Sequence, residues 1–374
     1  MSGIFAMTGA ISNEKMTRVL QSMHHRGPDE GKAILLDSFH LAHQRLSTVG
    51  LNGGQQPIVN KDKTKWIVAD GEIYNYQELK KQLPEEVEFL TESDCEVPLQ
   101  LYEREGVKAV KHLDGMFAFV IVDSEQNTFF AARDTLGIKP LYYGIDKENN
   151  IIFASELKTL SIVTEDVHEF PPGHYYTPEE GFVSYRSIQP PKKDNIFETD
   201  EFPQILEGIR MHLDNAVKKN LMADVEVGVL LSGGLDSSLI ALLAHENQKR
   251  NEPLKSFCVG RKNSEDVLRA REVAQEIGTQ HYEHVFDEQE LISHLREVIY
   301  YLESYDSSLV RSAIPSFFVS KLASKHVKVI LSGEGADELF SGYSYLKGIQ
   351  DKEKLDAKKL GIALRTSEES YDSK

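Results

Sequence analysis

Hydrophobic and polar positions follow a period of two in the first half of the chain. From Phe117 the residues FAFVIVD alternate and then run apolar, 124–127 form a polar turn, and TFFAARD resumes the strand pattern. Two such runs on either side of a short turn are typical of a β-hairpin. Short strands broken by Gly, Pro and Asn continue to about residue 185, with helices predicted at 15–23 and 92–106. The pattern predicts layered antiparallel sheet.

The second half follows a different period. Residues 202–221 have apolar positions at helical spacing. Short apolar runs then alternate with predicted helices: the runs start at Val225, Ser256, His281 and Val327, and the helices span 238–250, 264–277, 288–304 and 314–326. Strands that alternate with helices predict a doubly wound parallel sheet of the α/β class, with ligands at the carboxyl ends of its strands.

The change of period falls at a polar stretch that contains three prolines. A length of 374 residues also predicts two domains, at roughly 150 residues each. We therefore expect one domain at 1–187, a linker at 188–203, a second domain at 204–349 and a charged tail at 350–374.

Charge and composition exclude several functions. The net charge of −17 opposes binding to nucleic acid or to an anionic membrane surface. No apolar stretch approaches the ~18 residues of a membrane span, and the start of the chain lacks a signal-peptide pattern, so we expect a cytoplasmic protein. The only cysteines, Cys95 and Cys258, lie far apart and form no CxxC motif, which argues against a disulfide framework or a zinc cluster.

A glycine-rich loop follows the strand that starts at Val225. It reads SGGLDSS and supplies the candidates Ser232, Gly233, Gly234, Asp236, Ser237 and Ser238. Amides and hydroxyls that converge between a strand and a helix N-terminus bind pyrophosphate. The loop lacks the spacing and the lysine of a Walker loop. Asp236 would instead hold Mg²⁺, which prefers carboxylate and phosphate oxygens.

A second loop, SGEGADE at 332–338, follows the strand that starts at Val327 in the same relation. Two such loops at one sheet edge would converge on one ligand, here ATP with Mg²⁺. The second loop supplies Ser332 and Gly333 near the α-phosphate, Asp337 as a second metal ligand, and Glu334 near the group that is adenylated. Leu231 and Val259 end neighbouring strands and could line the adenine, or serve as plain core residues.

Both halves resemble one enzyme family. SGGLDSS is similar to the motif of N-type ATP pyrophosphatases, and SGEGADE with 305–306 and 310–313 resembles the synthetase domain of glutamine-dependent asparagine synthetases. Class II glutamine amidotransferase domains are similar at 25–29, 44–47, 71–75, 93–94, 114–119, 132–134, 137–142 and 171–174. The resemblance implies an α+β N-terminal-nucleophile domain, a four-layer sandwich, followed by an α/β ATP pyrophosphatase domain.

The family's chemistry implies the substrates. MgATP activates aspartate as β-aspartyl-AMP, and ammonia released from glutamine then forms the amide. The resemblance makes Ser2, Asp70, Gly71 and Glu334 the catalytic candidates, and it places glutamine at Arg45, Gly71, Glu72 and Asp94. Small-molecule partners and a homodimer are compatible with this assignment.

Two residues depart from the family at the glutaminase site. The family has a cysteine nucleophile where this chain has Ser2, and a hydroxyl is a much weaker nucleophile near neutral pH. The family has an oxyanion-binding asparagine where this chain has Asp70, and a carboxylate there repels the developing charge. Loss of one such donor costs about 10²–10³ in rate. We therefore expect an impaired glutaminase and a glutamine pocket that persists.

A third departure is at the carboxyl end. The family continues well beyond Tyr345 and supplies a lysine that steadies the pyrophosphate, and this sequence lacks that segment. The leading hypothesis is an asparagine-synthetase-like ATP-dependent amide ligase that draws on free ammonia. Two alternatives stay open: a catalytically silent binding or regulatory relative, and a different amide former similar to the β-lactam synthetases.

Overall fold

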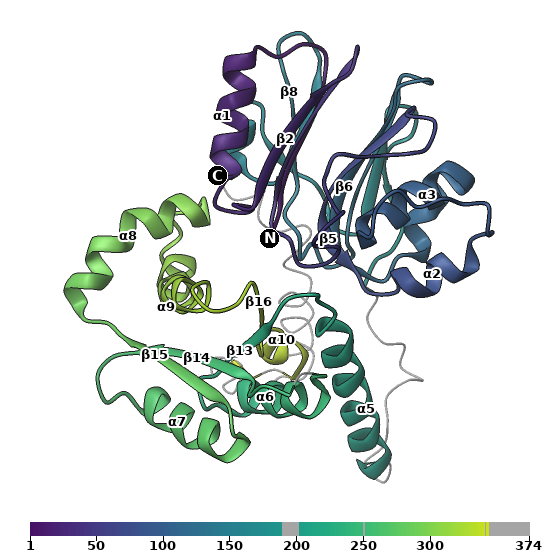
Figure 1. Cartoon of the computed structure of the whole chain (residues 1–374). Coiled ribbons are helices and arrows are strands. Elements are labelled where there is room, and N and C mark those ends of the chain that lie inside the picture. Colours follow the sequence, from purple (N-terminus) through teal and green to yellow (C-terminus); the bar gives the residue numbers. More distant parts are fainter. Residues whose placement is uncertain (189–201, 250, 341, 344–374) are drawn as a thin grey trace, which may run out of the picture. The chain divides into compact units, whose positions relative to one another are not determined.

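A computed structural model of the chain describes residues 1–188, 202–249, 251–340 and 342–343 (Figure 1). These residues form two compact units, one on each side of 189–201. The predicted linker at 188–203 lies outside the described residues except at its ends, and the predicted tail at 350–374 lies wholly outside them. No described helix is both long and apolar enough to span a bilayer.

The first unit contains two six-stranded antiparallel sheets. One sheet has the order β10 (His168–Glu169), β8 (Tyr142–Ile145), β9 (Ile151–Ala154), β1 (Gly3–Thr8), β3 (Phe39–Arg45) and β2 (Glu30–Leu35). The other has the order β12 (Gly181–Ser184), β11 (His174–Thr177), β7 (Thr128–Arg133), β6 (Gly115–Asp123), β5 (Lys65–Ile73) and β4 (Ile58–Val59). The antiparallel prediction is confirmed.

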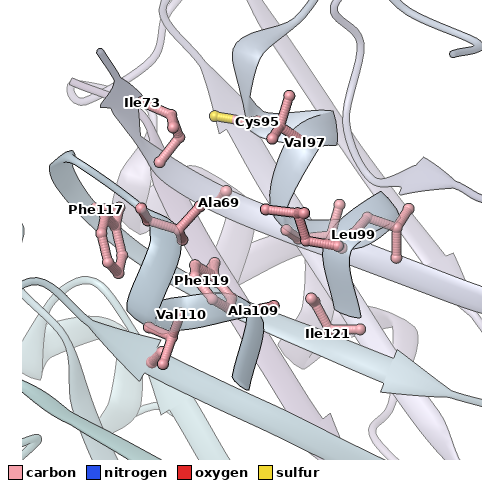
Figure 2. Packing of buried hydrophobic residues seen from close by; sticks show 14 of the residues in the cluster. Ala69, Ile73, Cys95, Val97, Leu99, Ala109, Val110, Phe117, Phe119 and Ile121 are labelled. Carbon is pink, nitrogen blue, oxygen red and sulfur yellow. The ribbon is translucent and has the colours of Figure 1, made fainter. Parts of the chain in front are cut away.

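Alternation along the strands divides their side chains between two packing layers. On β1, Ile4 joins the core that includes Val68 and Val120 of the other sheet, whereas Phe5 packs with α1 (Asn13–Met23) on the outer face. On β5 and β6, Ala69 and Phe119 face the helical side, as Figure 2 shows for the cluster they share with the helices. That side is built from α2 (Tyr76–Gln82), η1 (Asp94–Glu96), α3 (Val97–Glu105) and η2 (Gly106–His112), and α4 (Leu157–Leu160) packs near α1. The expected four-layer sandwich is confirmed.

The second unit contains a parallel sheet with the order β15 (Gln280–Val285), β14 (Lys255–Gly260), β13 (Val227–Leu230) and β16 (Val329–Leu331). Its helices are α5 (Phe202–Asn220), α6 (Leu235–Asn247), α7 (Glu265–Ile277), α8 (Glu288–Leu302), α9 (Ser307–Ala323) and α10 (Ala336–Phe340). The α/β prediction with a parallel sheet is therefore confirmed (Figure 1).

Predicted helix boundaries are wrong in three places. The helix predicted at 238–250 begins at Leu235 and ends at Asn247, so Asp236 lies in its first turn. The other two helices differ at their starts. The helix predicted at 314–326 begins at Ser307, because the Asp306 carboxylate caps it by accepting from the amides of Ser308 and Leu309 at 2.9 and 3.0 Å. The helix predicted at 92–106 is a 3₁₀ turn, η1, followed by α3, because Ser93 caps the turn through the amide of Cys95. Side-chain caps set both starts, and apolar periodicity does not reveal them.

Candidate functional sites

The amino-terminal end of β1 meets β5 at Ser2. The Ser2 amide donates to Asp70 Oδ1 at 2.9 Å, and the Ser2 hydroxyl oxygen accepts from the Leu46 amide at 3.3 Å. Arg26 Nε donates to the Ser2 carbonyl at 2.8 Å. The structure thus brings together the two residues at which the sequence departs from the amidotransferase pattern. We call Ser2, Arg26, Asp70 and Lys139 the Ser2 site.

Asp70 is a buried anion with two cationic neighbours. Its side chain contacts Arg26 Nη2 at 3.0 Å and Lys139 Nζ at 3.6 Å, and the residue is 1% exposed. Burial alone would raise the pKa of Asp70, but the charges of Lys139 and Arg26 lower it below its usual value. Asp70 is therefore ionised at neutral pH.

The sequence motifs alone do not identify Arg26 and Lys139 as site residues. They lie in the segments HRGPD and GIKP, which resemble amidotransferase motifs, so the signal was present. The segment HRGPD also contacts a third motif, QRLS. Asp29 Oδ2 accepts from the Ser47 amide at 2.8 Å, and this hydrogen bond connects the two segments.

Beside the Ser2 site lies a pair of carboxylates, Glu72 and Asp94. Glu72 Oε1 accepts from the Thr48 hydroxyl at 2.7 Å, whereas Glu72 Oε2 is buried and has no hydrogen-bond partner. Asp94 is 2% exposed and accepts from the Ile73 amide at 2.7 Å. Burial raises the pKa of both groups, and the charge of Asp94 raises that of Glu72 further. A buried, unpartnered oxygen in an acidic pair suits a cationic ligand.

Arg45, another predicted residue of this region, is the last residue of β3. Arg45 Nη2 donates to the Gly50 carbonyl at 2.7 Å, and Nη1 lies 3.9 Å from Glu30 Oε2. Because Leu46 contacts Ser2 and Thr48 contacts Glu72, the segment from Arg45 to Thr48 links the nucleophile position to the carboxylate pair.

Gly71 lies between Asp70 and Glu72 on β5, where the strands approach closely. A Cβ at Gly71 would lie 2.5 Å from the Met116 carbonyl oxygen on β6. Any larger residue would push β5 away from β6 and displace the residues on either side. Glycine is therefore required here for packing, independently of any role in catalysis.

The second unit has a cavity of about 350 Å³ at the carboxyl ends of its strands. Both glycine-rich loops line it, and the predicted residues that do so are Leu231, Ser232, Gly234, Asp236, Ser237, Val259, Ser332, Gly333, Glu334 and Asp337. We call it the two-loop cavity. Gly233 and Ser238, which were also predicted, are not among its lining residues.

Glycines let the first loop close against its surroundings. Gly233 has a φ of +76°, and a Cβ there would lie 2.6 Å from the Ala270 amide nitrogen on α7. A Cβ at Gly333 would lie 3.0 Å from the backbone nitrogen of Ser237. The two loops therefore touch through backbone, which leaves their polar atoms at one edge of the sheet.

Hydroxyls organise the first loop at the start of α6. Ser232 Oγ and Ser237 Oγ lie 3.0 Å apart, and the Ser232 amide donates to Ser237 Oγ at 3.2 Å. The Ser238 hydroxyl is buried and has no hydrogen-bond partner. A helix N-terminus with the Ser232 and Ser237 hydroxyls beside it is suited to an anionic group.

The charge of the two-loop cavity is uniformly acidic among the described residues. Its charged lining side chains are Asp236, Asp266, Glu334, Asp337 and Glu338, with no lysine or arginine. Sequence reasoning missed Asp266 and Glu338, and it also missed Pro315, Ser316 and Val319 of α9 and Tyr343. Asp266 follows the strand β14 by a few residues, as Asp236 follows β13, and that shared placement was a usable signal.

The acidic lining bears on metal binding. In the described part of the chain, no group of three or more His, Cys, Asp or Glu side chains could enclose a metal. Mg²⁺ commonly uses only one or two protein carboxylates, with phosphate oxygens and water completing its shell. Asp236 and Asp337, which line the same cavity, fit that requirement.

Comparison with known proteins agrees with this two-part organisation. The glutamine amidotransferase domain family matches residues 1–169, and the asparagine synthase family matches residues 208–372. Three relatives are similar over most of the chain. "Asparagine synthetase [glutamine-hydrolyzing] 3" of Arabidopsis thaliana is 41% identical over 95% of the chain and 63% of its own length. The corresponding enzyme of Sandersonia aurantiaca is 42% identical over 95% and 69%, and asparagine synthetase B of Escherichia coli K12 is 40% identical over 92% and 64%. The chain spans less than two thirds of the Arabidopsis relative's length.

Proposed function

The chain belongs to the glutamine-hydrolysing asparagine synthetase family, and from that premise we propose that it is an ATP-dependent amide ligase that converts aspartate to asparagine with free ammonia. The observation that carries the proposal is the convergence of both glycine-rich loops on the two-loop cavity. Two strand-to-helix loops at one sheet edge provide the anion-binding geometry that a nucleotide triphosphate requires.

The lining residues suggest how ATP would lie. The β- and γ-phosphates take the first loop, where Ser232 and Ser237 line the cavity near the start of α6. The α-phosphate takes Ser332 and Gly333, and the adenine lies against Leu231 and Val259. This orientation exposes the α-phosphorus to an attacking carboxylate and leaves pyrophosphate in the first loop.

Asp236 and Asp337 would hold Mg²⁺, which neutralises phosphate charge and stabilises the leaving pyrophosphate. The uniformly acidic lining supports this assignment, because ATP adds further negative charge to a cavity whose described lining contains no basic side chain. Without a divalent cation, electrostatic repulsion would oppose nucleotide binding.

The reaction has two displacement steps. A β-carboxylate oxygen of aspartate attacks the α-phosphorus of ATP, the bond to the β-phosphate oxygen breaks, and pyrophosphate leaves. Ammonia then attacks the β-carbonyl carbon, AMP leaves with the bonding electron pair, and the nitrogen loses a proton to solvent. Glu334 lies on the second loop beside the expected α-phosphate position and would orient the adenylated group.

The first unit would bind glutamine without efficient turnover. Arg45 supports the α-carboxylate, and Glu72 and Asp94 support the α-ammonium group, which matches the unpartnered oxygen of Glu72. Ser2 is a poor nucleophile, and the ionised Asp70 beside it cannot donate to an oxyanion. Ammonia would therefore come from solution.

Product analysis tests the ligase reaction. With saturating MgATP, aspartate and ammonium, we expect AMP, pyrophosphate and asparagine in equal amounts, and no AMP when aspartate is omitted. ADP instead of AMP would contradict the pyrophosphatase assignment. Absence of both nucleotide products would favour the silent relative, and AMP without asparagine would favour a different amide former.

A further inference from the structure

Arg26 and Asp70 together bind both backbone polar groups of Ser2. Asp70 Oδ1 accepts from the Ser2 nitrogen at 2.9 Å, and Arg26 Nε donates to the Ser2 carbonyl oxygen at 2.8 Å. Arg26 Nη2 also donates to Asp70 Oδ2 at 3.0 Å, which closes a ring of three contacts. The position of the Ser2 nitrogen is therefore fixed by side chains from two other segments of the chain.

Asp70 has no free capacity to act as a base. Its two oxygens face three donors, the Ser2 nitrogen, Arg26 and Lys139, and the residue is 1% exposed. A carboxylate with this many donors is stabilised in its charged form. Its contribution at this site is a fixed negative charge next to the Ser2 nitrogen.

An N-terminal nucleophile needs a different environment. Its free α-amino group must be neutral, because only a lone pair can take the hydroxyl or thiol proton during attack. A fixed anion at hydrogen-bond distance favours the protonated amine instead. An asparagine at the same place would leave the amine without this stabilising charge.

We propose that, in a chain that begins at Ser2, Asp70 is a positioning residue that stabilises the ammonium form of the α-amino group and so weakens the general base of the amidotransferase site. Its meaning for catalysis rests on the proposed function. Asp70 Oδ1 is the charged atom in direct hydrogen-bond contact with the Ser2 nitrogen.

Other charged groups around the site come from several elements and would modulate the effect. They are Arg26 after α1, Glu72 on β5, Lys139 after β7, and Glu156 after β9, which accepts from Arg26 Nη1 at 3.2 Å. Burial favours the neutral amine most strongly and lowers the pKa of the Met1 amino terminus to about 5, and Lys139 and Arg26 act in the same direction. Removing only the Asp70 charge leaves these influences unopposed. The change from Asp70 to Asn must therefore lower the pKa of the amine.

Acylation of the α-amino group measures its protonation state directly. The full chain is prepared with Ser2 as its first residue, verified by intact mass, and treated with the N-hydroxysuccinimide ester of acetic acid over about pH 6 to 9. Mass spectrometry of the N-terminal peptide gives the rate. Asp70→Asn should raise the rate near neutral pH at least tenfold and move the midpoint of the pH profile downward by about one unit or more.

Asp123→Asn is the matched control. Asp123 is also a buried carboxylate of this unit, 1% exposed, and lies 3.3 Å from Lys65 Nζ, away from the Ser2 site. The substitution Asp123→Asn should leave the acylation rate and the midpoint of its pH profile unchanged. A general loosening of the unit would raise the rate at every pH without moving the midpoint.

Equal rates and midpoints for the parent and Asp70→Asn would overturn the inference, and so would an equal change in Asp123→Asn. The acylation uses neither ATP nor aspartate. A shifted midpoint together with absent AMP formation would therefore leave this inference intact and reject the proposed ligase function.

Discussion

The two candidate sites differ in how far their carboxylates are exposed to solvent. In the first unit, Asp70 and Asp94 are buried and hydrogen-bonded within the protein. In the second unit, Asp236 in the first turn of α6 and Glu334 on the second loop are exposed and line the two-loop cavity. The first site already holds opposing charges of its own, whereas the second presents negative charge to whatever enters.

The difference follows from where each site lies in its sheet. Asp70 lies within strand β5, where it pairs with Ala118 of β6, and it is 1% exposed, so its charge must be accommodated inside the unit. Asp236 and Glu334 follow the ends of β13 and β16, where backbone leaves the sheet. A substitution in the first site therefore disturbs a network within the protein, and a substitution in the second mainly changes ligand affinity.

The strongest test of this contrast is restoration of the glutaminase. Ser2→Cys alone supplies a thiol but leaves Asp70 beside it, and Ser2→Cys with Asp70→Asn also supplies an oxyanion donor. We expect the double variant to release glutamate about 10²–10³ faster than the single variant. The rate of glutamate release with saturating glutamine measures this difference. The control is a second double variant, Ser2→Cys with Asp123→Asn, which should be no faster than Ser2→Cys alone. Equal rates in the two Ser2→Cys variants would show that Asp70 does not limit the site.

The second test concerns nucleotide binding in the two-loop cavity. Asp236→Asn should weaken MgATP binding at least about tenfold, equivalent to about 1.4 kcal/mol, because it removes a charged metal ligand without changing the loop's shape. Calorimetric titration gives the dissociation constant. Glu288→Gln is the control, since Glu288 forms an exposed ion pair with Arg261 at 3.2 Å and is not among the lining residues of the two-loop cavity. Unchanged affinity in Asp236→Asn would remove Asp236 from the metal site.

Sequence reasoning predicted the fold better than the details of either site. Period-two strands and the strand-helix alternation depend on apolar burial, which local sequence records, and both sheet types are confirmed. The start of α9 was wrong, because Asp306 determines it through two hydrogen bonds. The domain limits, the site assignments, the cytoplasmic location and the homodimer stay predictions.

The site residues that the sequence missed share a physical reason. Arg26 reaches Asp70 across 44 positions of the chain, and Asp266 enters the two-loop cavity from a helix outside both loops. Such contacts depend on tertiary packing and not on local pattern. The motifs identify segments that lie at the sites, but they do not show that Asp70 accepts a hydrogen bond from the Ser2 nitrogen.

The third test uses the pH dependence of glutamine binding at the carboxylate pair Glu72 and Asp94. Burial and Asp94 raise the pKa of Glu72, so the empty pocket retains a proton near neutral pH. A ligand ammonium group must displace this proton, and glutamine affinity should rise several-fold between about pH 6.5 and 8. Titration in two buffers with different ionisation heats would show proton release. Glu72→Gln should bind more weakly with a flatter pH profile, and a parent profile that is equally flat would contradict the assignment.

The smallest expected effect is that of Glu72→Gln on the thermal stability of the protein. Because the pKa of Glu72 is raised in the folded state, the native protein binds this proton more tightly than the unfolded chain does. Its favourable contribution is complete below the unfolded pKa of about 4.3 and is lost as the pH rises through the folded pKa. Glu72→Gln is neutral throughout and can still accept from Thr48, so it avoids this loss. We expect its melting temperature, relative to the parent, to be higher at about pH 8.5 than at about pH 5 by roughly 2–4 °C. The exposed substitution Glu85→Gln should track the parent at both values. A constant offset between Glu72→Gln and the parent would mean that Glu72 is ionised in the empty pocket, and the two sites would then differ less than their burial indicates.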